Sequence, residues 1–176
     1  MQIVLRRSSG ILALLLLLVL TPVAVRPQWR TANERELRKI IPSRAPVVKE
    51  NIETEFRTAS GVIDGHGKFI AGVVIITAGY SAEGKYSHFF ITQVPLKIGN
   101  LDLAPGPYVF GYQRTDNDTI RVSFYRASTG EAVGDIDAHV NRRTTAVRSL
   151  WISPPISGKA TIQVGRFIFD YRLNQK

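Results

Sequence analysis

Several stretches of this chain alternate between apolar and polar residues with a period of two. The C-terminal stretch is the most regular, since the aromatic residues Phe167, Phe169 and Tyr171 alternate with Arg166, Ile168, Asp170 and Arg172. Successive side chains of a β-strand point to opposite faces, so this period places the rings on one face. The same period recurs over residues 108–113, 120–125 and 135–140. The pattern predicts antiparallel strands with one buried face and one face in water.

The remaining segments extend this prediction to the whole C-terminal part of the chain. Residues 69–77 are nearly all apolar and rich in β-branched side chains, which predicts a central buried strand. Residues 116–118 and 128–130 have the composition of tight turns. About eight to nine short strands with regular turn signals are typical of a sandwich or barrel. We therefore expect an all-β fold over residues 47–176, namely an antiparallel β-sandwich of the immunoglobulin-like or prealbumin-like kind.

A short helix is predicted ahead of these strands. Thr31 and Glu34 fit a capping box, in which the threonine caps the helix and the glutamate reaches back. Leu37, Ile40 and Ile41 follow at helical spacing, and Pro42 ends the pattern. The stretch from Pro42 to Pro46 is interpreted as a linker. Residues 26–46 are thus expected to form a basic segment with one short helix and a linker.

The first 25 residues have the features of an export signal. Arg6 and Arg7 precede an unbroken apolar run over residues 11–20, and small residues follow it. This run is about half as long as a membrane-spanning helix needs. Basic residues follow directly, however, and positive charge resists translocation. We expect a signal peptide over residues 1–25 and a secreted or periplasmic protein; the alternative is a membrane anchor over residues 10–25.

The positive charge of the chain is concentrated after this leader. The chain has 23 Lys and Arg against 14 Asp and Glu, and residues 26–50 alone hold seven basic and three acidic side chains. Anionic headgroups attract such segments. One interpretation is therefore a membrane-surface contact through residues 26–49, and the other is a solvated tether. Export, and the lack of a nucleic-acid motif, argue against nucleic acid as a partner.

Two motifs lie within residues 60–112. The first is formed by Val62, Asp64, Gly67, Ile70, Gly72 and Ile75, and the second by Leu103, Pro105, Gly106 and Tyr108. In identity or character these residues resemble the motifs of the carboxypeptidase-regulatory-like (transthyretin-like) domain. Ser60, Phe69 and Val73 depart from the first motif of that family. The resemblance implies a non-catalytic accessory β-sandwich of the kind found in surface and transport proteins.

The candidate metal ligands are Asp135, Asp137 and His139. They share one face of a predicted strand, and oxygen and imidazole ligands suit several metals. A complete site needs another ligand from a different strand, for which His66 and His88 are available. The alternative, which we favour, is a solvated polar face. We assign no catalytic residue, metal or cofactor.

Residues 79–85 have the form G-x-x-x-x-G-K. A phosphate-binding loop requires Ser or Thr next and a helix after it, whereas Tyr86 and a predicted strand follow here. We interpret the segment as a hairpin loop with Gly84 in the turn. The chain also has no cysteine, which excludes disulfides, thiolate metal sites and a cysteine nucleophile.

These observations favour a binding or structural role over catalysis. We expect an exported, non-enzymatic β-sandwich that works in the cell envelope by binding a protein or a surface polysaccharide. One alternative is a carbohydrate-binding module that uses exposed aromatic residues, although aromatic residues at strand spacing are more often core. A further alternative is a small metal-dependent enzyme centred on Asp135, Asp137 and His139.

Overall fold

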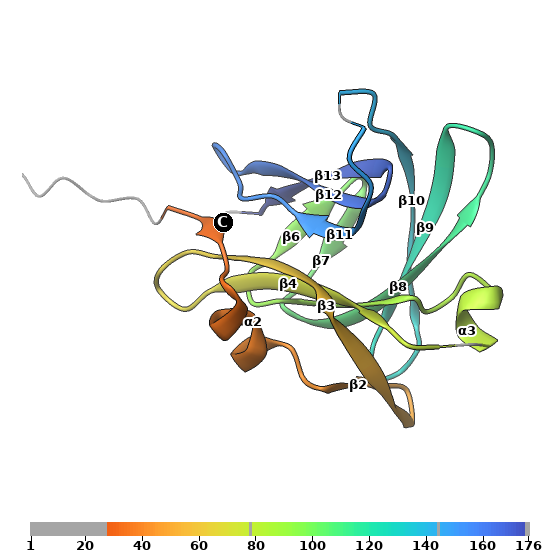
Figure 1. Cartoon of the computed structure of the whole chain (residues 1–176), viewed down its shortest axis with the longest axis horizontal. Coiled ribbons are helices and arrows are strands. Elements are labelled where there is room, and N and C mark those ends of the chain that lie inside the picture. The colour runs from red at the N-terminus through yellow and green to blue at the C-terminus, as the bar shows by residue number, and fades with distance from the viewer. Residues whose placement is uncertain (1–27, 78, 144, 175–176) are drawn as a thin grey trace, which may run out of the picture.

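The structure is a computed structural model that describes residues 28–77, 79–143 and 145–174 (Figure 1). The leader or anchor predicted over residues 1–25 lies outside the described residues. The elements are β1 (Arg30–Thr31), α2 (Glu34–Ile40), β2 (Arg44–Val47), β3 (Glu50–Ile63), β4 (Phe69–Ile75), α3 (Gly79–Ala82), β5 (His88–Thr92), β6 (Leu96–Ile98), β7 (Leu101–Leu103), β8 (Gly106–Arg114), β9 (Thr119–Arg126), β10 (Ala132–Val140), β11 (Arg148–Ile152), β12 (Lys159–Gly165) and β13 (Phe167–Leu173).

The strands form one sheet that nearly closes on itself. Hydrogen bonds join them in the order β1-β3-β4-β5-β8-β9-β10-β13-β12-β11, and every neighbouring pair is antiparallel. At the far end of this path, β11 packs back against β3 and β4. The all-β antiparallel class is therefore confirmed. The division into the two sheets of a sandwich is not confirmed, because these ten strands form one continuous hydrogen-bonded path, beside which β2 pairs with β3 and β6 pairs with β7 and β13.

Large apolar side chains fill the inside of the closed sheet. The predicted alternation is present in β9 and β13, whose inward residues are buried. The largest of the fully buried inward side chains are Phe90, Tyr108, Phe110, Phe124 and Tyr171. The phenylalanine rings among them pack edge-on or tilted, as between Phe110 and Phe124 with centroids 5.1 Å apart. Burial of this area supplies the main driving force for folding.

A second apolar cluster covers the outer face of the same sheet. Helix α2 and strand β2 contact β3 there, and their Leu37 and Val47 belong to one buried cluster with Val73, Phe89 and Val109 of β4, β5 and β8. This second cluster explains why β4 is apolar on both faces, as its sequence predicted. The expected linker from Pro42 to Pro46 is wrong in part, because β2 pairs with β3 within it.

The predicted helix is present, but its cap lies two residues further on. Asn33, not Thr31, caps α2: its side chain accepts a hydrogen bond from the Glu36 N–H, and the Glu36 carboxylate accepts one from the Asn33 N–H. Thr31 instead pairs with Val62 in the strand ladder. The Arg30 guanidinium, 2.6 Å away, lowers the pKa of Glu36 to about 2. The same capping-box chemistry therefore operates with a different residue pair.

Candidate functional site

The candidate metal ligands lie on the outer face of β10. Asp135, Asp137 and His139 are exposed and alternate with buried Ile136 and Ala138, as predicted. Arg121 on β9 forms an ion pair with Asp137 at 3.2 Å. The His139 Nδ1 lies 3.3 Å from the Thr119 hydroxyl. Among the described residues, no group of three or more Asp, Glu, His or Cys side chains is placed to hold a metal ion.

The structure does not bring the other two histidines to this face. His66 lies exposed in the β3–β4 turn, where Asp64 Oδ1 accepts hydrogen bonds from the N–H groups of His66 and Lys68. His88 lies buried inside the closed sheet and stacks on Phe110 with ring centroids 4.6 Å apart. The three histidines therefore occupy a turn, the core and an outer face.

Burial sets the protonation state of His88. Removal from solvent lowers its pKa to about 4, against a smaller opposing effect of the Ser149 carbonyl. The neutral ring donates from Nε2 to that carbonyl at 3.3 Å, and its Nδ1 accepts from the Ser87 hydroxyl at 2.8 Å. Because Ser149 is on β11, this bond joins β5 to β11 and is structural.

The aromatic stripes noted in the sequence belong mainly to the core. Tyr108 and Phe110 are buried, as are the three aromatic residues of β13, whereas Tyr112 is 41% exposed. The Tyr108 hydroxyl donates to the Ala104 carbonyl at 2.7 Å, which holds the turn before β8. These stripes therefore do not form an exposed aromatic row.

The segment resembling a phosphate-binding loop forms a short turn against β8. Residues Gly79–Ala82 make only α3, and Gly84 adopts a positive φ of 70° in the following turn, as predicted. The Lys85 ammonium pairs with Glu83 at 2.9 Å. Gly111 on β8 lies directly beneath this turn, where only glycine leaves room for the backbone of Gly84 and Lys85.

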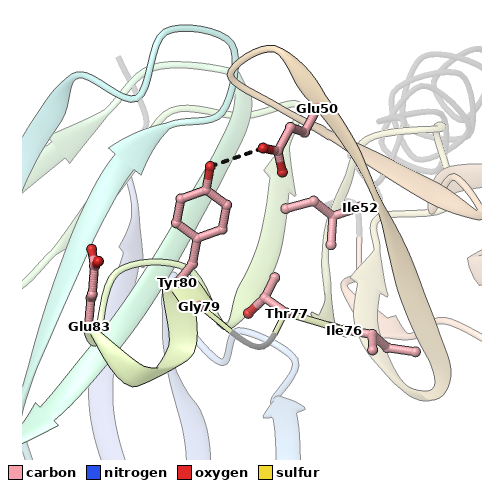
Figure 2. Close-up of a pocket in the computed structure, with 7 residues that line it drawn as sticks. All are labelled: Glu50, Ile52, Ile76, Thr77, Gly79, Tyr80 and Glu83. Carbon is pink, nitrogen blue, oxygen red and sulfur yellow. Dashed lines mark hydrogen bonds between the residues drawn. The ribbon is translucent and has the colours of Figure 1, made fainter.

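This turn and the start of β3 border a shallow depression in the described surface. We name it the β3–α3 depression; it is open, has a volume of about 370 Å³ and is lined by Glu50, Ile52, Ile76, Thr77, Gly79, Tyr80 and Glu83. Figure 2 shows Glu50 and Tyr80 pointing toward each other from opposite sides. Ile76 is 57% exposed at its edge.

Tyr80 is the central side chain of the depression. Its hydroxyl donates to Glu50 Oε1 at 3.3 Å (Figure 2). The nearby negative charge of Glu50 is the main reason that its pKa is raised. Its ring lies 4.9 Å from Tyr86, which in turn meets Tyr125 edge-on at 5.3 Å. The packed rings hold Tyr80 in place, so the depression is a preformed surface of one aromatic ring and two carboxylates.

Sequence patterns indicate this depression only in part. Residues 79–85 are recognisable as a loop, but Glu50 is distant in sequence and comes from a strand whose start no pattern marks. Strand β3 must bend over the outer face for Glu50 to meet Tyr80, and its pairing with β4 is irregular between Glu55 and Ser60. A bend of this kind has no simple periodicity that sequence reasoning could detect.

Comparison with protein-family models, with curated proteins and with solved structures found no match. The resemblance to a carboxypeptidase-regulatory-like domain therefore stays a prediction. In the part of the chain that the structure describes, no helix is long and apolar enough to cross a bilayer.

Proposed function

We propose that this protein is an exported, non-catalytic β-domain that acts in the cell envelope by binding another protein. The β3–α3 depression would receive a basic side chain of that partner. Export is supported by the order of basic, apolar and small residues over residues 1–25. The observation that carries the binding role is the β3–α3 depression itself, which lies on the outer surface and is lined by Glu50, Tyr80 and Glu83.

The depression has the chemistry of a site for a cation. The inside of the sheet is filled by aromatic and aliphatic side chains, so a partner is received on the outer surface. There, Glu50 places a carboxylate with no ion pair among the described residues beside apolar Ile52 and Ile76, and the Glu83 carboxylate, which pairs with Lys85, lies at the other side; the net charge of the chain is +9. Carboxylates form strong, charge-assisted hydrogen bonds with Lys and Arg, and complementary charge favours a specific partner.

A non-catalytic role is supported by the positions of the titratable groups. His88 is enclosed by Phe110 and Ser149, and Asp137 is engaged by Arg121. General acid–base catalysis needs such groups within hydrogen-bond reach of one another and of a substrate. The alternative of a small metal enzyme at Asp135, Asp137 and His139 has less support than binding.

The proposed membrane contact through residues 26–49 would use only some of the cations of that segment. Arg30 and Arg38 are engaged by Glu36 and Glu34 at 2.6 and 2.7 Å, and Arg38 also lies 4.2 Å from the centre of the Phe56 ring. These two guanidinium groups therefore interact with side chains of the same chain. The remaining cations of the segment would supply any attraction to headgroups.

Two finer features of the fold belong to the same proposal. The first is that the nearly closed sheet is flattened into two packed layers, as in a sandwich. The second is that the domain is related to the carboxypeptidase-regulatory-like domains. Support comes from the motif residues: Asp64 caps the first turn, and the Tyr108 hydroxyl closes the turn that contains Pro105 and Gly106. Both motifs thus have structural roles independent of any ligand.

A carbohydrate-binding module is the second candidate, favoured by the half-buried Tyr80 ring between two carboxylates. A binding experiment distinguishes the two. The full chain is immobilised, and an envelope extract is separated into protein and polysaccharide fractions. We expect a defined protein to be retained at low salt, released at high salt, and lost with Glu50→Gln combined with Glu83→Gln. The amide oxygen introduced by Glu50→Gln still accepts the Tyr80 hydrogen bond, so the fold is kept.

The matched control is Tyr112→Ala, which removes an exposed ring elsewhere on the surface. This variant should retain the protein as the wild type does. Retention of polysaccharide instead, lost with Tyr80→Ala, would favour the carbohydrate candidate. Equal retention by the wild type and the double variant would overturn the assignment of the depression.

A further inference from the structure

A row of exposed residues crosses the strands at one end of the molecule. Ile156 pairs with Lys159, Lys159 with Arg172, and Arg172 with Lys97 as successive antiparallel partners. Directly opposed residues of antiparallel strands project from the same face. All four side chains are exposed, and the residues that alternate with them, such as Tyr171 and Ile98, are buried. We name this set the basic row.

The charges of the basic row are not balanced within the fold. Like charges placed directly opposite each other destabilise a sheet, yet three cations occupy successive positions here. Lys97 pairs with Asp102 at 3.3 Å. In the described part of the chain, Lys159 and Arg172 form no ion pair, although Asp170 lies two residues away on the same outer face. The row therefore presents a net positive surface to an external anion.

An apolar side chain stands at the end of this row. Ile156 is 81% exposed, the highest value among the large hydrophobic residues that the structure describes. Its backbone N–H and C=O both bond to Lys159, at 2.9 and 3.1 Å, and Leu173 donates to the Gly158 carbonyl at 2.9 Å. Pro154 and Pro155 precede it. The hydrogen bonds thus hold the hairpin tip in place with a single exposed isoleucine beside the cations of the row.

The basic row also lies where the N-terminal segment joins the fold. Figure 1 shows the start of the described chain, the β3–β4 turn and the β11–β12 tip directed to the same side of the molecule. The apolar run ends at Leu20, and Trp29, which packs against the inner core, is nine residues later. Nine residues span at most about 30 Å. If residues 10–25 are kept as an anchor, this spacing places the same end of the molecule close to the bilayer.

We propose that the basic row docks the protein onto a bilayer that contains anionic lipids. Lys159 and Arg172, which form no ion pair among the described residues, contact headgroup phosphates, while Ile156 enters the interfacial layer beside them. Combined electrostatic attraction and apolar insertion is the usual basis of peripheral membrane binding. The proposal rests on the envelope location proposed above, and it adds a surface that residues 26–49 do not contain.

The absence of cysteine from the chain permits a direct test. Ile156→Cys and Val147→Cys are each labelled with an environment-sensitive fluorophore in the full chain. Val147 is the matched control, since it is 73% exposed but lies beyond the opposite end of β11. Vesicles are made of phosphatidylcholine with and without phosphatidylglycerol, and include nitroxide-labelled lipids as quenchers. We expect a blue shift and quenching at position 156 with phosphatidylglycerol, and neither effect at position 147.

Further variants separate charge from insertion. Lys159→Gln with Arg172→Gln should abolish the quenching at position 156 on anionic vesicles. Equal quenching at both positions, or none at either, would overturn the proposal. Binding of inorganic phosphate without quenching by lipid would also overturn it, since the anion would then be soluble. Because the vesicle test does not depend on export, a cytosolic protein that still docks would refute the proposed location while leaving the basic row intact.

Discussion

The Ser60 hydroxyl accepts a hydrogen bond of 2.9 Å from the backbone N–H of Ile152, a residue 92 positions later in the chain. Ser60 lies on β3 and Ile152 on β11, the two strands that meet where the sheet closes. A side chain here replaces part of the strand-to-strand ladder. Both residues are buried, so water does not compete for the N–H group.

Replacing Ser60 with alanine should weaken this closure. The Ile152 N–H would be left buried without an acceptor, which costs about 1–3 kcal/mol. We expect the free energy of unfolding, measured by chemical denaturation, to fall by that amount. Ser128→Ala is the control, because Ser128 lies exposed in the β9–β10 turn and its loss should change stability little. Equal stability of wild type and Ser60→Ala would mean that the closure is not held by this bond.

The buried His88 predicts a specific loss of stability in mild acid. The unfolded residue takes up a proton near its ordinary pKa of 6.5, whereas the folded residue does so only at about 4. Between these values the unfolded state binds more protons, so stability falls as the pH falls. A shift of this size corresponds to about 3 kcal/mol at most. Unfolding free energies measured from neutral pH to pH of about 4 should show this slope.

His88→Phe should remove that part of the slope, since a phenyl ring fills the site without titrating. The variant is less stable at neutral pH because the Ser149 carbonyl loses its donor, so the slope and not the level is the readout. His66→Gln, in the exposed β3–β4 turn, serves as the control. An unchanged slope in His88→Phe would show that the acid response arises elsewhere.

Gly111 should not tolerate even a methyl group. A Cβ at this position would overlap the carbonyl oxygens of Gly84 and Lys85, which belong to the backbone and have little freedom to shift. Overpacking of this kind costs about 1–3 kcal/mol or more. We expect Gly111→Ala to lower the melting temperature and to displace the turn that forms the β3–α3 depression. Gly79→Ala, where a Cβ meets no atom within 4 Å, is the matched control.

Local alternation was sufficient to predict strands β9, β10 and β13, because each has one face in the core and one in water. It failed for β2, whose Pro46 suggested a linker although the strand pairs with β3. It also misplaced the helix cap, since Thr31-x-x-Glu34 and Asn33-x-x-Glu36 both satisfy the capping pattern and only tertiary pairing of Thr31 distinguishes them.

Long-range features could not be derived from such patterns. Closure of the sheet depends on contact between β3 and β11, and the β3–α3 depression depends on Glu50 reaching Tyr80. The basic row likewise depends on the registers of three strand pairings, and a shift of one residue would move each cation to the opposite face. The identity of a single residue does not indicate which distant residue it will contact in the folded chain.

The central claim is that the protein leaves the cytosol and works in the envelope. It is tested most directly by fractionating cells that express a C-terminally tagged chain and by measuring the mass of the recovered protein. We predict recovery from the envelope or the periplasm, with loss of about 25 N-terminal residues if the leader is a signal peptide, or at full mass in the membrane fraction if it is an anchor. Recovery of full-length protein from the cytosol would contradict the account.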